Sequence, residues 1–424
     1  MKTAAKMTSG AVALVVACTL GLSAGALEPR AGLSESDRLL FDLGLAQLNR
    51  EWKPAPDTDV AFDGLGPLYI ARSCDACHPG GKAGPGPRFT DDPTDRARRM
   101  AIAIEPADPV FGARIQPFGV ENVPPEGIPH IDWKTRTTPD GTELAEPVIR
   151  LAPSPYGAVA ADRALSGRVA PELAGLGLLA LVPEDAIRAN ADPDDRDGDG
   201  ISGRVSEPVP ADPIGRFGWR AERVDLRDQI AHALFLDMGL SSATLPDSAG
   251  DCTVSQTACR TAPNGAGGVS GDTEAAVAVV DQMVDAVALA AMPRAAPRDP
   301  QGEALFARFG CAACHVPSLP VAGASTGETE IAAYTDLLLH DMGDGLAARD
   351  GNGTPRLFEW RTAPLWGMAE RLASGTPGLL HDGRAASVAE AILWHGGEAE
   401  TALGAYENAD TASREALARF VENL

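Results

Sequence analysis

Basic residues are scarce in this chain of 424 residues. It has 36 Lys and Arg against 59 Asp and Glu, which gives a formal net charge of −23 at pH 7. Nucleic acids are bound through clusters of Lys and Arg, so this imbalance excludes nucleic-acid binding from the expected functions. The acidity serves either solubility or the electrostatic steering of a basic partner toward the surface.

Apolar runs long enough to cross a bilayer are absent beyond the first 26 residues. Those residues begin with two lysines, continue through the apolar stretch Ala11–Leu22 and end in the small residues Ala24–Ala26. This order is typical of a secretory signal peptide. Val15–Cys18 also resembles a lipoprotein cleavage box, so lipid attachment at Cys18 is the alternative. The sequence predicts a signal peptide over 1–26 and a mature protein in the periplasm, with no transmembrane segment.

Cysteine is uncommon as well, but four of the seven stand in two copies of the pattern Cys-x-x-Cys-His. In this pattern each thiol adds to a vinyl group of a porphyrin and the His ligates the iron, which makes it the attachment site of a c-type haem. A single copy also fits chance, a zinc site or a redox dithiol. Two copies in one exported chain predict two covalently bound haem c groups. The predicted haem-binding residues are Cys74, Cys77, His78, Cys311, Cys314 and His315.

Two further cysteines, Cys252 and Cys259, are separated by six residues in a loop rich in Ser, Thr, Gly and Asp. In an oxidising compartment such a pair is expected to form a disulfide. A redox-active pair is the alternative.

An acidic loop at 192–204 contains Asp195, Asp197 and Asp199 followed by Gly200. Alternating carboxylates before a Gly form the first half of a calcium-binding loop, because they converge on one hard cation at a sharp turn. The bidentate Glu of an EF-hand is missing, since Ser206 stands at loop position 12. We therefore predict a calcium site at the three aspartates that is not a standard EF-hand, against the alternative of a solvated acidic turn.

Helical spacing of apolar residues predicts helices over 34–52, 222–240 and 273–292, and a helical stretch over 171–190 in which Pro183 starts a second short helix. Residues 105–165, rich in Pro, Gly and β-branched residues, are expected to be irregular with short strands. The fold is therefore expected to be mainly α, with two c-type cytochrome haem domains.

The Pro-rich stretch 293–300 marks the expected boundary between these domains. The first, 27–292, would carry loop-rich insertions, which are the acidic loop at 192–204 and the Cys loop at 252–259. The second, 293–424, would be a cytochrome c-like haem domain.

The second axial ligand of each iron decides the chemistry, because a closed haem transfers electrons and an open one also binds peroxide or oxygen. The capping box Ser387–Glu390 begins a helix that ends near His395, beside two glycines. For the first haem no His occurs between His78 and His130. His130 is thus the nearest His candidate there, and the alternative is an open or water-bound iron. The candidates downstream of the second motif are His340, Met342, Met368, His381 and His395.

Along nearly the whole mature chain, ordered motifs resemble the bacterial di-haem oxidoreductase family, whose members are described as peroxidases or thiol oxidoreductases. This family is related to the di-haem cytochrome c peroxidase superfamily. The motifs that carry the resemblance are Ala191–Arg204, Gly215–Trp219, Gly310–Pro317, Tyr334–Gly343, Glu359–Trp366 and Leu380–Glu398.

The resemblance implies a ligand for the second haem. In the related peroxidases a His-Asp-Gly segment is followed by a helix whose end supplies that ligand, usually Met. Here His381-Asp382-Gly383 is followed by His395, so the resemblance implies the pair His315/His395. His in place of Met lowers the reduction potential of a haem. This departs from the activation of those peroxidases, which needs a high-potential His/Met haem.

The resemblance also implies an indole between the haems, for which Trp219 is the first candidate and Trp360 the second. Many of the peroxidases carry a displaceable His soon after the first motif, and this sequence has none there. A peroxide site needs a proton carrier near the open iron. The candidates in the segment that would cover the first haem are Glu121, Glu126 and His130.

Together these features predict a periplasmic di-haem oxidoreductase that is peroxidase-like. A small oxidant such as hydrogen peroxide would bind at the N-terminal haem, and the C-terminal haem would relay electrons from a soluble donor protein. One alternative is an electron-transfer cytochrome with both irons closed and no substrate of its own. Another is haem-dependent oxidation of a protein or organic substrate.

Overall fold

The computed structural model describes residues 27–58, 62–208, 213–266, 275–293, 299–323 and 329–424. The expected signal peptide with Cys18, and residues 294–298 of the expected domain boundary, lie outside this set. Among the described residues, none of the helices combines the length and the apolar character that a membrane crossing requires.

The fold mixes α-helices and β-strands, so the prediction of a mainly α protein is wrong. Among the described residues, helices account for 32% and strands for 18%. Most of the difference lies between residues 100 and 169, which form long strands instead of irregular structure. The sequence did not predict these strands because prolines interrupt the strand pattern. Pro147, for example, lies inside a strand of a two-stranded ribbon, where both strands are edges and the missing N–H of proline is tolerated. The strands are β2 (Met100–Asp108), β5 (Pro129–Thr137), β6 (Glu143–Leu151) and β7 (Ala164–Val169).

A five-stranded antiparallel sheet with the order β12-β11-β7-β2-β3 joins distant parts of the chain. β7 pairs with β2 from Met100↔Val169 to Glu105↔Ala164 on one side. On its other side it pairs with β11, where Arg349 lies opposite Leu165. The sheet therefore combines strands from both sides of the expected domain boundary. The other strands of the sheet are β3 (Gly112–Arg114), β11 (Ala348–Asp350) and β12 (Pro355–Leu357).

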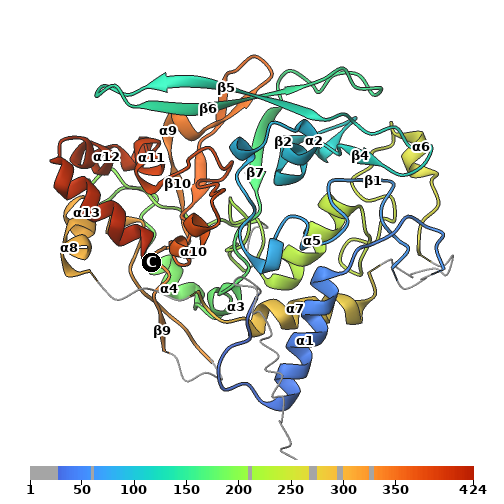
Figure 1. Ribbon diagram of the computed structural model, residues 1–424, viewed down its shortest axis with the longest axis horizontal. Helices are drawn as coiled ribbons and strands as arrows, with labels where there is room; N and C mark the ends of the chain where they lie inside the picture. The colour runs from blue at the N-terminus through green and yellow to red at the C-terminus, as the bar shows by residue number, and fades with distance from the viewer. Residues whose placement is uncertain (1–26, 59–61, 209–212, 267–274, 294–298, 324–328) are drawn as a thin grey trace, which may run out of the picture.

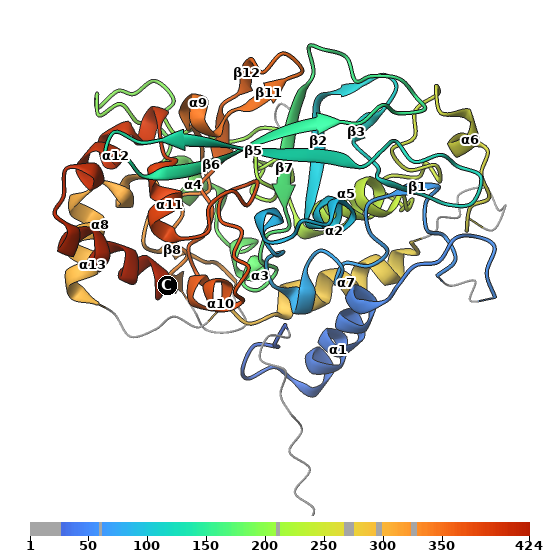
Figure 2. The same cartoon turned by 45° about the horizontal axis from the view of Figure 1, so that its top comes forward.

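The ribbon of β5 and β6 crosses one side of the molecule and reaches both the C-terminal helices and the region of α2 (Figures 1 and 2). The remaining strands form short pairs. They are β1 (Leu68–Tyr69) with β4 (Phe118–Gly119), β8 (Leu319–Pro320) with β9 (Glu330–Ile331), and β10 (Leu339–Asp341) with β13 (Glu359–Arg361).

Local capping signals place several helices where the sequence predicts them. Asp225 accepts a hydrogen bond from the N–H of Asp228 at the start of α5 (Leu226–Met238), and Gly239 ends it in the left-handed region. The helical stretch predicted over 171–190 forms two short helices, α3 (Leu176–Leu179) and α4 (Glu184–Ala189), and the second follows Pro183 as expected. The other α-helices are α1 (Glu35–Asn49), α2 (Pro93–Arg99), α6 (Thr257–Arg260), α7 (Val277–Leu289), α8 (Pro300–Arg308), α9 (Gly343–Leu346), α10 (Met368–Ala373), α11 (Val388–Leu393), α12 (Glu400–Glu407) and α13 (Thr411–Glu422).

Two large apolar clusters form the core. One gathers α1, α5 and α7, and the other packs the sheet strands β2 and β7 against the C-terminal helices α8, α11 and α13. Figure 1 shows these two groups of helices on opposite sides of the molecule. Each cluster contains residues from before and after the expected boundary, and the second surrounds the cavity described next.

Candidate functional site

The second Cys-x-x-Cys-His motif follows α8 directly. Gly310, with φ of 84°, turns the chain from this helix into the short 3-10 helix η3 (Cys311–Ala313). Nδ1 of His315 lies 2.9 Å from the carbonyl oxygen of Tyr334, so this nitrogen carries the proton and donates it. Nε2 of His315 is then the nitrogen that is available to a metal.

A cavity opens beside this motif and encloses about 1400 Å³ of space, including its opening to solvent. Cys311, Cys314, His315 and His395 all line it. Most of the remaining wall is apolar and includes Phe306, Leu346, Leu365, Leu379, Leu380, Val388, Ile392, Leu403, Leu417 and Val421.

His395 enters the cavity from the end of α11. The side chain of Ser387 accepts the N–H of Glu390 and begins this helix, as the capping box predicts. Nδ1 of His395 donates to the carbonyl oxygen of Ala391 over 2.8 Å, which leaves Nε2 free. Burial lowers the pKa of His395 and lowers that of His315 to about 4. Both imidazoles are therefore neutral at pH 7, which is the form that ligates iron.

The other candidate ligands of the second haem are two methionines and two histidines. Met342 and Met368 line the cavity. Both ring nitrogens of His340 are hydrogen-bonded to carboxylates, those of Glu398 and Asp336. The ring of His381 stacks on Trp360, with centroids 3.6 Å apart and planes 9° apart. Burial lowers the pKa of His381 to about 3, so it is neutral.

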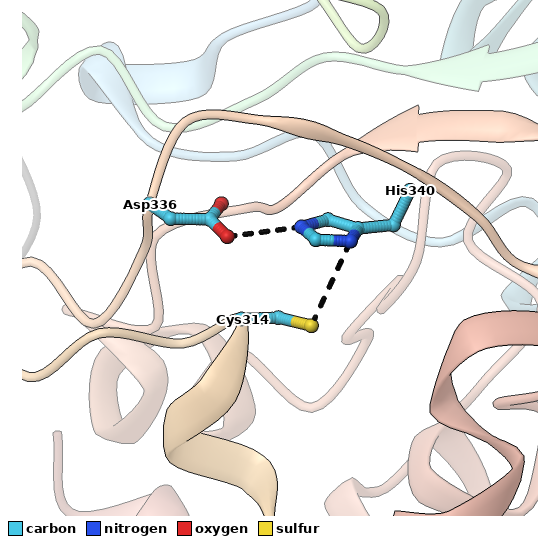
Figure 3. A group of neighbouring side chains, drawn as sticks. All are labelled: Cys314, Asp336 and His340. Atoms are coloured by element: carbon cyan, nitrogen blue, oxygen red, sulfur yellow. Dashed lines mark hydrogen bonds and ion pairs between the residues drawn. The ribbon is translucent and has the colours of Figure 1, made fainter. Parts of the chain in front are cut away.

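His340 lies in a buried cluster beside Cys314 (Figure 3). Its Nε2 is 2.9 Å from a carboxylate oxygen of Asp336, its Nδ1 is 2.6 Å from Glu398, and its Nδ1 is 3.8 Å from Sγ of Cys314. Burial alone would lower its pKa, but the hydrogen bonds to Asp336, Cys314 and Glu398 raise the pKa to about 12. His340 is thus a charged imidazolium between two carboxylates. The sequence did not single out Glu398 as the partner of His340.

The first Cys-x-x-Cys-His motif has the same local design. Nδ1 of His78 donates to the carbonyl oxygen of Pro171 over 2.8 Å, which again leaves Nε2 available. Burial raises the pKa of the Cys74 and Cys77 thiols to about 12. A redox dithiol or an activated nucleophile needs the opposite shift, toward the thiolate. The environment of this motif therefore disfavours the dithiol alternative.

The cavity at the second motif fits a haem. It offers two thiols in the attachment spacing, two neutral imidazoles and an apolar wall. It also offers a cation for the propionates of the porphyrin, because Arg371 lines the cavity and its Nε is buried with no hydrogen-bond partner among the described residues. Burial lowers the pKa of Arg371 only to about 10, so it stays charged at neutral pH. Arg371 was not among the residues that the sequence singled out.

Both candidate tryptophans lie in the cavity wall. The indole N–H of Trp219 donates to the carbonyl oxygen of Val169 over 2.8 Å. Val169 is two residues before Pro171, whose carbonyl holds His78. Trp219 thus connects the cavity at the second motif with the backbone segment that orients the first. The indole N–H of Trp360 donates to Leu346 within the C-terminal part.

The candidate proton carriers lie away from this cavity. His130 is exposed in β5, opposite Arg150, and Glu121 is exposed in a turn. Glu126 is buried, and its carboxylate accepts hydrogen bonds from the backbone N–H of Gln116 and from the side chain of Gln256, each at 2.6 Å. Burial raises its pKa to about 8, so it holds a proton at neutral pH. None of the three lines the cavity at the second motif.

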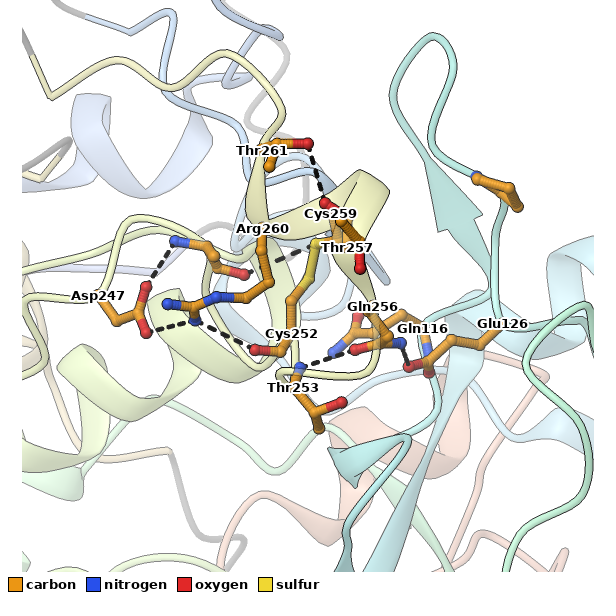
Figure 4. The surroundings of a disulfide bond; sticks show 12 residues. Gln116, Glu126, Asp247, Cys252, Thr253, Gln256, Thr257, Cys259, Arg260 and Thr261 are labelled. Carbon is orange, nitrogen blue, oxygen red and sulfur yellow. Dashed lines mark hydrogen bonds and ion pairs between the residues drawn. A yellow bond between two sulfur atoms is a disulfide. The ribbon is translucent and has the colours of Figure 1, made fainter.

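The structure joins Cys252 and Cys259 in a disulfide, and Glu126 lies close to it (Figure 4). Gln256, which binds Glu126, also accepts the N–H of Thr253 between the two cysteines. Both cysteines are buried. The disulfide thus fixes a loop that supports a buried carboxyl group.

In the acidic loop, Asp195, Asp197 and Asp199 come together with one carboxylate oxygen each within 4.8 Å of the others. Oδ1 of Asp195 accepts the N–H of Gly200, which has φ of 87°. The turn therefore has the compact form that the sequence predicts. The following residues, Ser202 and Gly203, bind Glu398 near the second motif.

Comparison with known proteins gives one family. The model of the family described as "Di-haem oxidoreductase, putative peroxidase" matches residues 158–424, which include the cavity and the second motif. None of the curated proteins matches significantly. A solved structure of Kuenenia stuttgartiensis hydrazine synthase, pressurised with xenon at 20 bar, aligns over 100% of this chain and 99% of its own. Its identity is 11% and its TM-score 0.31, a likeness too low to indicate a shared fold or activity.

Proposed function

Because the chain belongs to the di-haem oxidoreductase family, we propose that it is an exported, peroxidase-like enzyme with two covalently attached haem c groups. The observation that carries this proposal is the cavity in which two Cys thiols and the two neutral imidazoles of His315 and His395 meet. A bound haem supplies reversible electron transfer and, where its iron keeps an open position, a binding site for a small oxidant.

At the second site the chain's residues close the coordination shell. Cys311 and Cys314 would hold the porphyrin, and His315 and His395 would ligate its iron from Nε2. The Nδ1–H bonds to backbone carbonyls fix the tautomer and the orientation of both rings. Such a closed site favours electron relay from a soluble donor protein.

At the first site Cys74 and Cys77 would hold the porphyrin and His78 would ligate its iron. The chain offers no second His close in sequence, so we assign the binding of a small oxidant such as hydrogen peroxide to this site. Trp219 would carry electrons toward it, since its N–H binds the segment that also holds His78. That Glu126 or His130 supplies protons there stays a prediction.

Export rests on the signal-peptide pattern of residues 1–26, and we propose the periplasm as the location. This compartment suits the disulfide between Cys252 and Cys259.

The state of the two irons tests the proposal. In the purified ferric protein we expect one high-spin and one low-spin haem by EPR, because we assign two strong ligands to the second site and one to the first. Hydrogen peroxide should change the high-spin signal. Two low-spin signals that do not respond to peroxide would instead support an electron-transfer cytochrome. A high-spin signal that responds to peroxide, together with oxidation of an organic or protein substrate in place of the donor protein, would support the third alternative.

Calcium at Asp195, Asp197 and Asp199 is the second metal in the proposal. Three converging carboxylates in a compact turn suit a hard cation. Removal of calcium with a chelator should lower the melting temperature of the protein, and re-addition should restore it. The double variant Asp197→Asn/Asp199→Asn should melt at the lower temperature with or without chelator. If the wild-type protein is insensitive to chelation, the turn is only solvated.

A further inference from the structure

Glu398 is the first residue after His395 that has a side chain, because two glycines separate them. Its side chain is only 9% exposed. One carboxylate oxygen accepts hydrogen bonds from the hydroxyl of Ser202 at 2.5 Å and from the N–H of Asp341 at 3.2 Å. The other accepts from His340 at 2.6 Å and from the N–H groups of Ser202 at 3.1 Å and Gly203 at 3.3 Å. A single carboxylate therefore joins its own segment to two others, 202–203 and 340–341.

The contacts of Glu398 matter for His395 because two glycines separate these residues. Gly397 has φ of 56°, and a Cβ on it would lie 2.3 Å from the carbonyl oxygen of Asp341, so a glycine is required for the close approach to β10. Gly396 likewise contributes no side chain. The backbone that follows His395 is thus permissive, and the next side chain that fixes it belongs to Glu398.

His340 connects Glu398 to the second Cys-x-x-Cys-His motif. Its ring lies between Glu398 and Asp336. Figure 3 shows Asp336 on one side of the ring and Cys314 beside it, with Sγ 3.8 Å from Nδ1. Although burial acts to raise it, hydrogen bonds from His340 and Ser202 lower the pKa of Glu398 to about 2. Glu398 is therefore ionised at any physiological pH, and it connects the segment of His395 with the segment of Cys314.

We propose that Glu398 is a positioning residue that holds the imidazole of His395 in the cavity. This rests on the proposed His315/His395 pair. Without the carboxylate, the N–H groups of Ser202, Gly203 and Asp341 and Nδ1 of His340 lose this partner. Polar groups left without a partner in such partly buried surroundings cost free energy, and native structures avoid them. The segment would rearrange to satisfy them, and the glycine pair would let His395 move with it.

EPR of the ferric holoprotein tests the role in two variants. Glu398→Ala should split the low-spin signal into several species and convert part of it to high-spin, with a shifted reduction potential of the second haem. Glu398→Gln should keep one low-spin species with a smaller shift, because the amide oxygen still accepts some of these bonds while its NH₂ group opposes the remaining donors. Glu146→Gln is the matched control. Glu146 lies in β6, pairs with Arg349 and does not line the cavity, so its variant should keep the wild-type signal.

The outcomes separate the two proposals. If His395→Ala leaves the low-spin signal unchanged, the ligand pair itself is wrong and the role of Glu398 fails with it. If His395→Ala removes the signal but both Glu398 variants keep the wild-type spectrum and potential, only the positioning role fails, even where their melting temperature falls. If Glu398→Ala does not fold, Glu398→Gln decides: an unshifted spectrum and potential would overturn the role.

Discussion

His395→Ala is expected to convert the low-spin signal of the second haem to high-spin, which would leave the ferric protein with two high-spin haems. His395 is the imidazole that shares the cavity with His315 and has a free Nε2. His340 is not positioned to replace it, because both of its nitrogens bind carboxylates. Loss of a strong-field ligand should also raise the reduction potential of this haem. EPR and a spectroscopic redox titration measure the two effects.

His232→Ala is the control for this substitution. His232 lies in α5, where its Nδ1 contacts Asp228, and it does not line the cavity. Its variant should keep both haem signals. A low-spin signal that survives in the His395 variant would assign the ligand to another group of the cavity wall, Met342 or Met368.

Replacement of both cysteines of one motif by Ser should reduce the covalently bound haem from two groups to one. A Ser hydroxyl forms no thioether, so the porphyrin cannot be attached at that motif. The change applies to Cys74 with Cys77, and separately to Cys311 with Cys314. Intact-mass spectrometry of the denatured protein counts the attached haems. The variant of the second motif should lose the low-spin signal and the variant of the first the high-spin signal.

The remaining pair, Cys252 and Cys259, provides the control for the haem count. They are joined in a disulfide, and Gln256, which lies between them in the sequence, donates a hydrogen bond to Glu126. Their double Ser variant should still carry two haems. A haem count that is unaffected by changes in either Cys-x-x-Cys-His motif would contradict covalent attachment and reopen the zinc alternative.

Helix ends were readable from the sequence because they depend on neighbouring residues. Ser34, Asp225 and Ser387 each cap the helix that follows, and Gly239 ends α5. Strands were less readable because they depend on distant partners. β7 is buried on nearly all of its residues, so it lacks the alternation that marks a half-exposed strand.

The site was predictable to a similar extent. The Cys-x-x-Cys-His spacing is local, and the helix that carries His395 begins at a local capping box. By contrast, the contacts of Glu398 with Ser202 and of His340 with Asp336 arise only when loops meet in space. Likewise, the position of Arg371 in the cavity wall depends on the tertiary fold and cannot be read from its neighbours in α10.

The pairing of β7 with β11 constrains the order in which parts of the chain can fold. Leu165 and Arg349 are neighbours in the sheet but far apart in sequence. This edge of β7 therefore stays unpaired until the C-terminal part has been synthesised and has folded against it. Open strand edges attract foreign strands, and long-range pairings form late. A fragment that ends before β11 would therefore expose a strand prone to aggregation, and a fragment that begins after β7 would leave β11 without its neighbour. Because β7 and β11 come from opposite sides of the expected domain boundary, the sheet closes only when both parts of the chain are present.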